Sequence, residues 1–209
     1  MNIILFGGTG TIGERIYSEA VSRDHQVTLF VRPGREIQLS PPPASVLKGD
    51  LAKVDDVVAA VLGQSAVVSA LGPRGEVSTL VQTYETLVAG LTKAGVRRLL
   101  VVGGAGSLEM APGKPLYDSP QFPKEALPIA KAQGEVLEFL KTTDLDWTYI
   151  SPPALIEPGE RTGHYRRGEN QLLTDANGKS EISAEDYAVG LIDELETAQA
   201  LRKRITFAW

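Results

Sequence analysis

The sequence contains no cysteine and only two histidines, His25 and His164, among its 209 residues. These absences exclude disulfide bonds, a cysteine nucleophile, cysteine-ligated metal and histidine-rich metal sites. There is no apolar run near the roughly 20 residues that a membrane-spanning helix requires, and no signal-peptide pattern opens the chain. The formal net charge is −5 without a long basic run, which argues against a nucleic-acid-binding protein. We therefore expect a cytoplasmic protein that binds no metal, membrane or nucleic acid.

What the sequence does contain is an alternation of short apolar runs and segments with helical periodicity. The apolar runs predicted as strands lie at 2–6, 26–32, 44–50, 65–72, 96–104 and 146–151. The segments predicted as helices lie at 11–24, 54–63, 78–95 and 125–144. Continuous apolar strands that alternate with helices are typical of a parallel sheet covered on both faces. The predicted fold class is therefore α/β, with a doubly wound, mainly parallel sheet and helices on both of its faces.

The alternation changes after residue 151. Residues 170–183 are predicted to form a hairpin or a pair of short strands around Asn177-Gly178, a dipeptide that favours tight turns. A helix is predicted at 183–196. Residues 204–209 are predicted to form a last strand that closes the sheet.

We expect residues 1–209 to form a single domain. Within it, residues 152–183 are predicted to supply substrate-side loops and a small extra element over the carboxyl edge of the sheet. Two long stretches rich in proline and glycine, 103–123 and 152–168, are predicted to be the functional loops, because long ordered loops commonly carry binding residues.

The stretch between the first strand and the first helix holds four glycines in the seven positions from Gly7 to Gly13. It fits the pattern G-x-G-x-x-G in the context that this pattern requires, since it follows a strand and opens a helix. Glycines there let a pyrophosphate approach the backbone, and the helix N-terminus offers free N–H groups. The sequence therefore predicts a dinucleotide site rather than a merely structural turn. The predicted contacts in this loop are Gly7, Thr9, Gly10, Thr11, Ile12 and Gly13.

The end of the second predicted strand indicates which dinucleotide is bound. Sites for NAD commonly place an acidic residue about 20 residues beyond the glycine loop, but this sequence has Arg32 there. A guanidinium can pair with the 2′-phosphate of NADP, which a carboxylate would repel, so we predict NADP(H) over NAD(H). A solvated surface arginine is the alternative. Asp50 and Leu51, after the third strand, are predicted at the adenine edge, although Asp50 fits a plain turn nearly as well.

Several motifs together resemble a known family. The chain contains, in this order, "FGGTGTIG" (6–13), "SALG" (69–72), "VVGGAGSL" (101–108), "DWTYISPPALIEPGERTG" (146–163) and "ISAEDYA" (182–188). On these motifs it resembles the atypical short-chain dehydrogenase/reductases, in particular the small NAD(P)H-binding group of NmrA-like proteins and candidate NADH-flavin reductases. The resemblance implies a Rossmann fold in which two further segments border the cofactor. These are Ala70, Leu71 and Gly72 after the fourth strand, and Pro152, Pro153 and Ala154 beside the nicotinamide.

The catalytic set of the family is incomplete in this sequence. Family members with the full set use Tyr-x-x-x-Lys on the helix after the fifth strand, and a serine near the end of that strand. Lys131 falls at the position of the lysine, where the resemblance implies contact with the nicotinamide ribose, although an exposed helical lysine fits equally well. Leu127 stands where the tyrosine is expected. Gly103 and Gly104, predicted beside the cofactor, stand where the serine is expected, and Ser107 follows them.

The missing tyrosine limits the chemistry. Reduction of a ketone produces an alkoxide that needs a proton from an acid, whereas reduction of a flavin or quinone puts the hydride into a delocalised acceptor. We therefore expect an NAD(P)H-dependent oxidoreductase that transfers hydride to a flavin- or quinone-like small acceptor, as a monomer or homodimer. Tyr117 is the first candidate for a relocated acid, followed by His164 and Tyr165. A non-catalytic NADP(H) sensor of the NmrA type and a sugar-nucleotide epimerase or dehydratase are the alternatives.

Overall fold

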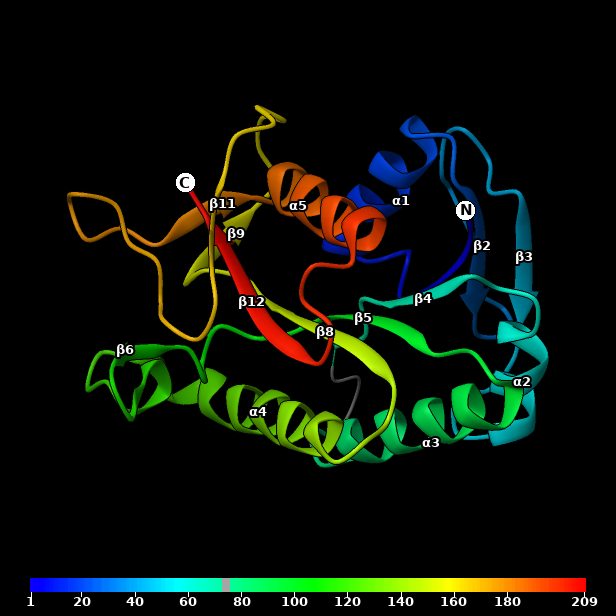
Figure 1. Ribbon diagram of the computed structural model, residues 1–209, viewed down its shortest axis with the longest axis horizontal. Coiled ribbons are helices and arrows are strands. Elements are labelled where there is room, and N and C mark those ends of the chain that lie inside the picture. Colours follow the sequence, from blue (N-terminus) through cyan, green and yellow to red (C-terminus); the bar gives the residue numbers. More distant parts are fainter. Residues whose placement is uncertain (73–75) are drawn as a thin grey trace.

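An eight-stranded sheet runs through the centre of the molecule and carries helices on both sides (Figure 1). The structure, a computed structural model, describes residues 1–72 and 76–209. The amino-terminal half of the chain alternates strands and helices. These are β1 (Asn2–Phe6), α1 (Thr11–Ser22), β2 (Gln26–Val31), β3 (Ser45–Lys48), α2 (Val54–Val61), β4 (Ala66–Ser69), α3 (Thr79–Ala94) and β5 (Arg98–Val102).

The carboxy-terminal half is less regular and contains several short elements. It begins with β6 (Glu109–Ala111), β7 (Lys114–Pro115), the 3-10 turns η1 (Leu116–Asp118) and η2 (Lys124–Ala126), and α4 (Leu127–Lys141). It continues with β8 (Asp146–Ser151), β9 (Leu155–Glu157), β10 (Arg166–Gly168), β11 (Glu181–Ser183), α5 (Ala184–Thr197) and β12 (Lys203–Ala208). Among the described residues, none of the helices is long and apolar enough to cross a membrane.

The strands of the central sheet follow the order β10-β12-β8-β5-β4-β1-β2-β3. All of them are parallel to their neighbours except β10, which pairs antiparallel with β12. β1 therefore lies in the interior, between β4 and β2, and the strand order reverses at this point. In doubly wound sheets the ligand binds at the carboxyl ends of the strands beside such a reversal. The predicted fold class is confirmed.

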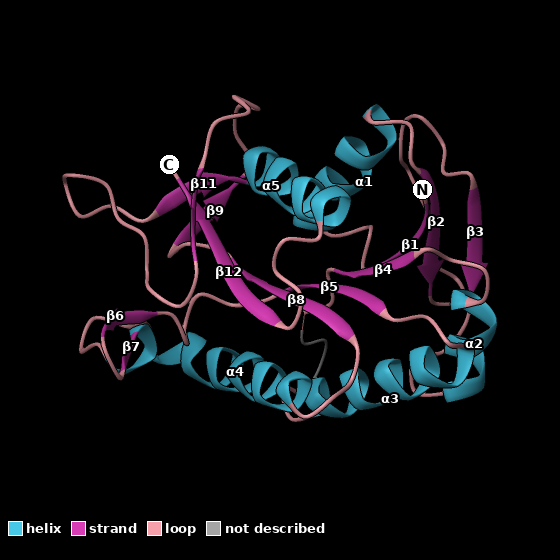
Figure 2. Ribbon diagram, viewed as in Figure 1, coloured by secondary structure: helices cyan, strands magenta, loops and turns pink. Residues whose placement is uncertain are grey.

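Two apolar layers pack against the faces of the sheet. Figure 2 shows α1 and α5 on one side and α2, α3 and α4 on the other, and the two hydrophobic cores follow this division. The strands are apolar along most of their length because both faces are covered, and every residue of β4 is buried, Ser69 included. On α3, Leu80, Tyr84, Leu87 and Leu91 form one buried face, as their helical spacing predicts. The helices cover the two faces of the sheet but not the carboxyl ends of its parallel strands, and the candidate site lies at these ends.

The hairpin predicted at 170–183 is not present. Asn177-Gly178 does form a tight turn, in which Gly178 has a positive φ of 80°, but the described residues on its two sides do not pair as strands. Instead β11 pairs in parallel with β9. The small extra element is therefore a pair of strands, one from the beginning and one from the end of the 152–183 segment. Local turn chemistry identified the turn, whereas the pairing partner was decided by contacts distant in the sequence.

The carboxy-terminal strand also differs from its expected role. The sequence predicts that 204–209 closes the sheet, but β12 lies between β8 and β10, and β10 is the edge strand. β10 has no apolar run, since it reads Arg-Arg-Gly, and the strands of the β6–β7 hairpin within the 103–123 loop, Glu-Met-Ala and Lys-Pro, are too short to form one. Short edge strands of this kind pair through backbone groups and leave little trace in hydropathy.

Candidate functional site

The glycine-rich loop joins β1 to α1 in the middle of the sheet, and two of its glycines are required by the fold itself. Gly7 has a φ of +79°, and a Cβ there would lie 2.4 Å from the carbonyl oxygen of Ala70, directly after β4. A Cβ on Gly13 would lie 2.2 Å from the Gly7 carbonyl oxygen. A side chain at either position would collide with backbone, so both glycines are needed to bring the first turn of α1 close to the sheet.

Gly10 is different, because the described structure does not require a glycine there. Its φ of −99° and ψ of 166° are extended backbone that any residue adopts. A Cβ would meet one described atom, the Gly7 carbonyl oxygen, at an ordinary distance of 3.6 Å. α1 begins directly after Gly10, and in the described residues no side chain caps its first turn. The free N–H groups of that turn and the space left at Gly10 fit the pyrophosphate of a dinucleotide.

A cavity of about 290 Å³ lies on the β2 side of the glycine loop. Arg32 and Arg35, which follow β2, form part of its wall together with Asp50 and Leu51, which follow β3. Both arginines are exposed, and the Arg35 guanidinium donates to the Thr9 carbonyl oxygen at 3.5 Å. Positive charge therefore gathers at the end of β2, where a dinucleotide places its adenosine ribose.

Asp50, for which the sequence allows either an adenine contact or a plain turn, has a local role in the structure. Its carboxylate accepts a hydrogen bond from the Ala52 N–H at 3.0 Å, and its own N–H donates to the Asp56 carboxylate at 2.8 Å. These are the contacts of a turn residue between β3 and α2. The carboxylate lines the cavity while the turn holds it, and its contact with the adenine edge stays a prediction.

A second cavity, of about 390 Å³, lies on the opposite side of the loop and shares Leu71 and Gly72 with the first. It brings together most of the residues predicted beside the cofactor. These are Gly10, Thr11, Ile12, Gly13, Ala70, Leu71, Gly72, Gly103, Gly104, Pro152, Pro153 and Ala154. The remaining lining residues are Val102, Ala105, Gln133 and Ile156. The two cavities, which meet at Leu71 and Gly72, are together called the groove, and none of the described residues that line its second half has a titratable side chain.

Tyr149 of β8 explains why glycines follow β5. Its buried ring fills the space that a Cβ on Gly103 would occupy, 2.1 Å from the nearest ring carbon. Its hydroxyl accepts a hydrogen bond from the Gly104 N–H at 3.1 Å and donates one to the Gln133 carbonyl oxygen at 2.8 Å. Burial raises the pKa of Tyr149 well above its ordinary value. The hydroxyl therefore ties the loop after β5 to α4, and it is already committed as a donor.

Comparison with known proteins agrees with this geometry. A family model described as NAD(P)H-binding matches residues 7–198, a range that contains the glycine loop and the walls of both cavities. The chain belongs to the NAD(P)H-binding family. A nicotinamide dinucleotide is therefore the cofactor class of the chain, and the space left at Gly10 fits its pyrophosphate.

Three solved structures resemble the chain over its whole length. A Burkholderia pseudomallei protein described as a candidate exported protein is 45% identical, with 100% of both chains covered and a TM-score of 0.90. A Bacteroides thetaiotaomicron protein described as a candidate epimerase is 40% identical over 100% of this chain and 96% of that chain, with a TM-score of 0.93. A Streptococcus pneumoniae protein described as a candidate NADH-flavin reductase is 36% identical over 100% of this chain and 99% of that chain, with a TM-score of 0.84.

These similarities confirm the resemblance to the small NAD(P)H-binding group of atypical short-chain dehydrogenase/reductases. They support an oxidoreductase-like fold with a nicotinamide cofactor. The preference for NADP over NAD and the location in the cytoplasm stay predictions.

The three residues predicted as catalytic meet, but not in this groove. Ser107, Tyr117 and Lys131 line a third cavity, of about 770 Å³, between α4 and the hairpin of β6 and β7. The loop after β5 packs on α4 beside it, and a Cβ on Gly106 would lie 2.5 Å from the Ala130 Cβ. None of the three residues is among the described residues that line the groove. The structure therefore places Ser107 and Tyr117 together but beside the groove, and their roles as proton donors stay predictions.

Lys131 does not lie with the predicted cofactor contacts. It is exposed and faces the third cavity, whereas Gln133 of the same helix lines the groove. Two residues on a helix are about 200° apart around its axis, so both cannot face the same ligand. The implied contact between Lys131 and the nicotinamide ribose is not supported by this geometry, and the exposed helical lysine is the better description.

The other candidate acids also lie outside the groove. Tyr165 donates a hydrogen bond to the Asp193 carboxylate of α5 at 2.5 Å, and its ring packs edge-on against Phe207. Burial and this carboxylate raise the pKa of Tyr165 well above its ordinary value. His164 is exposed, and its backbone N–H donates to the Thr162 hydroxyl at 3.1 Å. Both residues stabilise the loop between β9 and β10.

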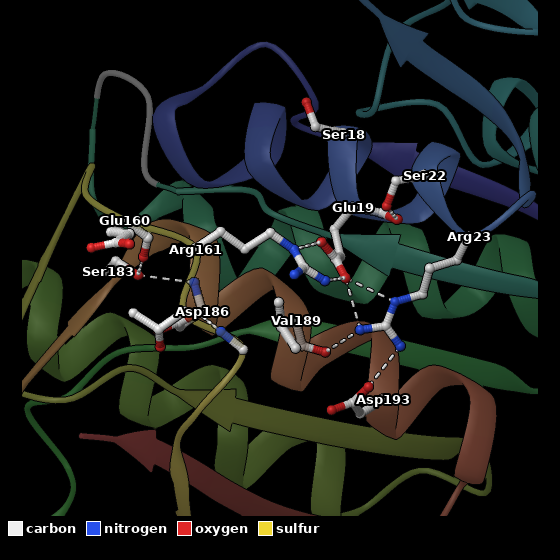
Figure 3. Close-up of polar contacts among 12 residues, drawn as sticks. Ser18, Glu19, Ser22, Arg23, Glu160, Arg161, Ser183, Asp186, Val189 and Asp193 are labelled. Carbon is white, nitrogen blue, oxygen red and sulfur yellow. Dashed lines mark hydrogen bonds and ion pairs between the residues drawn. The ribbon is translucent and has the colours of Figure 1, made fainter.

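Part of that loop, residues 158–164, which we call the strap, is fixed to two helices (Figure 3). Arg161 donates two hydrogen bonds, of 2.7 and 2.8 Å, to the Glu19 carboxylate of α1. Glu19 is only 5% exposed and also pairs with Arg23 at 2.8 Å. The next two strap residues donate to the Asp186 carboxylate of α5 at 2.5 and 2.8 Å. These contacts fix the strap, which follows β9 and the Pro-Pro-Ala wall of the groove, to α1 and α5.

Gln133 is the lining residue that sequence reasoning missed, although a signal for it exists. Ala130, Leu137 and Leu140 are buried and lie at helical spacing. Gln133 falls three residues after Ala130 and four before Leu137, on this same stripe. A polar residue within the apolar stripe of a helix is a candidate for a ligand contact, because it must find a hydrogen-bond partner where it is buried.

Proposed function

We propose that the protein is an NADPH-dependent reductase that transfers hydride to a flavin- or quinone-like small molecule. The observation that carries this proposal is the second half of the groove. It lies beside the glycine loop, where the nicotinamide of a family cofactor is expected, and the described residues that line it include no titratable side chain. Such a wall can bind two ring systems, but it cannot donate a proton.

The adenosine half of the groove supports NADPH over NADH. Arg32 and Arg35 line it directly after β2, where a site selective for NAD would place a carboxylate. A guanidinium binds a phosphate group through parallel, charge-assisted hydrogen bonds. In this proposal the two arginines hold the 2′-phosphate, and the N–H groups at the start of α1 hold the pyrophosphate.

The walls around the nicotinamide support a delocalised acceptor. Reduced nicotinamide supplies a hydride, which carries both electrons of a C–H bond to the acceptor and leaves the oxidised ring. The residues of the chain bind and orient the two ring systems and exclude water from between them. A conjugated acceptor spreads the added charge, so its proton can come from solvent after the transfer. A simple ketone would form a basic alkoxide that needs an acid, and we expect slow or absent reduction of ketones.

The test is an acceptor screen with purified protein, in which NADPH consumption is followed with riboflavin, a quinone and a simple ketone in parallel. The proposal predicts turnover with the flavin or the quinone and little with the ketone. Fast reduction of the ketone would overturn it, because that reaction needs a proton donor. Equal kcat/KM for NADPH and NADH would overturn the role given to the arginines.

The same wall favours one other function, a non-catalytic NADP(H) sensor, because a protein that only binds its cofactor needs no acid. Tight binding of NADPH without oxidation by any acceptor would decide for the sensor. An epimerase or dehydratase is less well supported, although one similar structure is described as a candidate epimerase. Those reactions require a side chain that moves a proton, and the described residues that line the second half of the groove do not supply one.

A further inference from the structure

We propose that Gln133 orients the acceptor, and that its side-chain amide makes the site prefer ring systems that carry a carbonyl group next to an N–H. This inference rests on the proposed function and goes further, because it assigns a specificity-determining residue and a chemical feature of the substrate. Gln133 is not part of the family pattern on which the resemblance rests.

The side chain of Gln133 lies in the wall of the groove. Its amide lies over Gly104, where a Cβ would come within 1.9 Å of the Gln133 Oε1 atom. Its backbone carbonyl accepts the hydrogen bond from the buried Tyr149 hydroxyl, which also accepts from the Gly104 N–H. The loop after β5 and the middle of α4 are therefore tied together at the backbone of this residue. The lack of a side chain on Gly104 gives the amide its place in the wall.

The amide of Gln133 has its hydrogen-bonding capacity left for a ligand. Within the described part of the chain, neither its oxygen nor its nitrogen makes a hydrogen bond, although the residue is half-buried. Most of its neighbours in the cavity wall are glycine, alanine, proline and aliphatic residues. A ligand that covers this wall without pairing with the amide would leave it desolvated and unsatisfied, which is costly.

The chemistry of an amide selects the matching feature of the ligand. A glutamine side chain presents a carbonyl oxygen that accepts and an NH2 group that donates, side by side in one plane. The complementary edge has an N–H next to a carbonyl, as in the imide of a flavin ring. A quinone without N–H can satisfy the donor but leaves the oxygen unpaired. Sites built to pair with a polar group discriminate strongly against ligands that lack it.

The test compares Gln133→Met, which keeps the length of the side chain and removes the amide, with Lys131→Met on the opposite side of the same helix. Riboflavin represents acceptors with an imide, and menadione represents acceptors with carbonyls alone. Binding of riboflavin to the NADP⁺-loaded protein is measured by flavin fluorescence, and kcat/KM is measured for both acceptors with NADPH.

We expect Gln133→Met to weaken riboflavin binding and lower its kcat/KM by at least about tenfold, with less than about threefold change for menadione. The dissociation constant of NADPH stays unchanged, and Lys131→Met changes none of these values. Gln133→Asn, which retains an amide, restores part of the preference for riboflavin.

Three results would overturn the proposal. Equal losses for both acceptors would indicate that Gln133 only shapes the wall, and a tenfold weaker binding of NADPH would assign the amide to the nicotinamide. Unchanged riboflavin binding would remove any role in acceptor recognition. If the unmodified protein consumes no NADPH with any acceptor, the proposed function fails, while the binding measurement still decides the role of Gln133.

Discussion

Replacing Gly10 with aspartate should have opposite effects on folding and on cofactor binding. Gly10 is the N-cap of α1, its backbone is extended as N-cap residues require, and in the described residues no side chain caps the helix. A carboxylate there accepts hydrogen bonds from the N–H groups of the first turn and complements the helix dipole. Those are the groups that the pyrophosphate needs, so the variant blocks the site with its own charge.

The magnitudes can be worked out from this geometry. A Cβ at Gly10 meets the Gly7 carbonyl oxygen at 3.6 Å, so the substitution adds no clash with described atoms. An aspartate cap gains a few tenths of a kcal/mol over glycine and about 0.3–1 kcal/mol from the dipole. For a chain of this size the sum raises the Tm of the cofactor-free protein by about 1–5 °C. In the unmodified protein, NADPH at a hundredfold excess over its Kd adds about 2.7 kcal/mol, or roughly 5–11 °C.

The assay is thermal unfolding of both proteins with and without NADPH, with Gly13→Ala as the matched control. The account predicts that Gly10→Asp has a Tm at or above that of the unmodified protein and no shift with NADPH. Gly13→Ala is expected to lower the Tm without ligand, because its Cβ would lie 2.2 Å from the Gly7 carbonyl oxygen. A Gly10→Asp protein that is still stabilised by NADPH would refute the placement of the pyrophosphate. A large fall in its Tm would refute the description of Gly10 as sterically free.

Three further predictions concern the cofactor, the proton and the strap. Arg32→Glu should weaken NADPH binding by more than tenfold, since a hydrogen bond to a charged group is worth about 1.5–3 kcal/mol, and should leave NADH binding unchanged or improved; calorimetric titration measures both, and equal losses would contradict the role of Arg32. Tyr117→Phe should lower kcat by less than the roughly 10²–10⁴-fold expected for the loss of a general acid, and complete loss of NADPH oxidation would identify Tyr117 as the acid. Burial raises the pKa of Asp186, but hydrogen bonds from Thr162, Trp209 and the strap backbone outweigh burial and hold this pKa below its ordinary value. Stabilisation from a depressed pKa is present above the unfolded-state value of about 3.9 and is lost as the pH falls through the folded-state value. Asp186→Asn should therefore lower the Tm at neutral pH, and this loss should shrink below about pH 4. A loss of Tm that is constant with pH would show that the charge of Asp186 does not cause the stabilisation.

The part of the site around the glycine loop can be predicted from the sequence because its requirements are local. The contact that excludes a side chain at Gly13 is with Gly7, six residues earlier, and the glycine pattern of this turn also covers Gly7, whose own contact with Ala70 lies outside the local segment. The position of Arg32 follows in turn, because a βαβ unit fixes where the second strand ends. The buried faces of the helices can be predicted from the spacing of their apolar residues, which is also a local property.

The acceptor side could not be predicted in the same way, because distant contacts determine it. Whether Lys131 or Gln133 faces the groove depends on how α4 is rotated against the sheet. That rotation is set by Tyr149, which bonds both Gln133 and Gly104 from a strand later in the chain. The pairing of β11 with β9 likewise brings together segments that a local hairpin rule does not connect.

The central claim is that hydride transfer in this groove needs no proton from the protein. A pair of isotope effects on a single turnover tests it most directly, with NADPH deuterated at the transferred position and with deuterium oxide as solvent. A single turnover is used because product release often limits kcat. The account predicts that deuterated NADPH slows the reduction of riboflavin and that deuterium oxide leaves its rate unchanged. A slower rate in deuterium oxide would contradict the account if the solvent isotope effect multiplies the isotope effect of deuterated NADPH. Such a product would place a proton transfer in the same step as the hydride transfer.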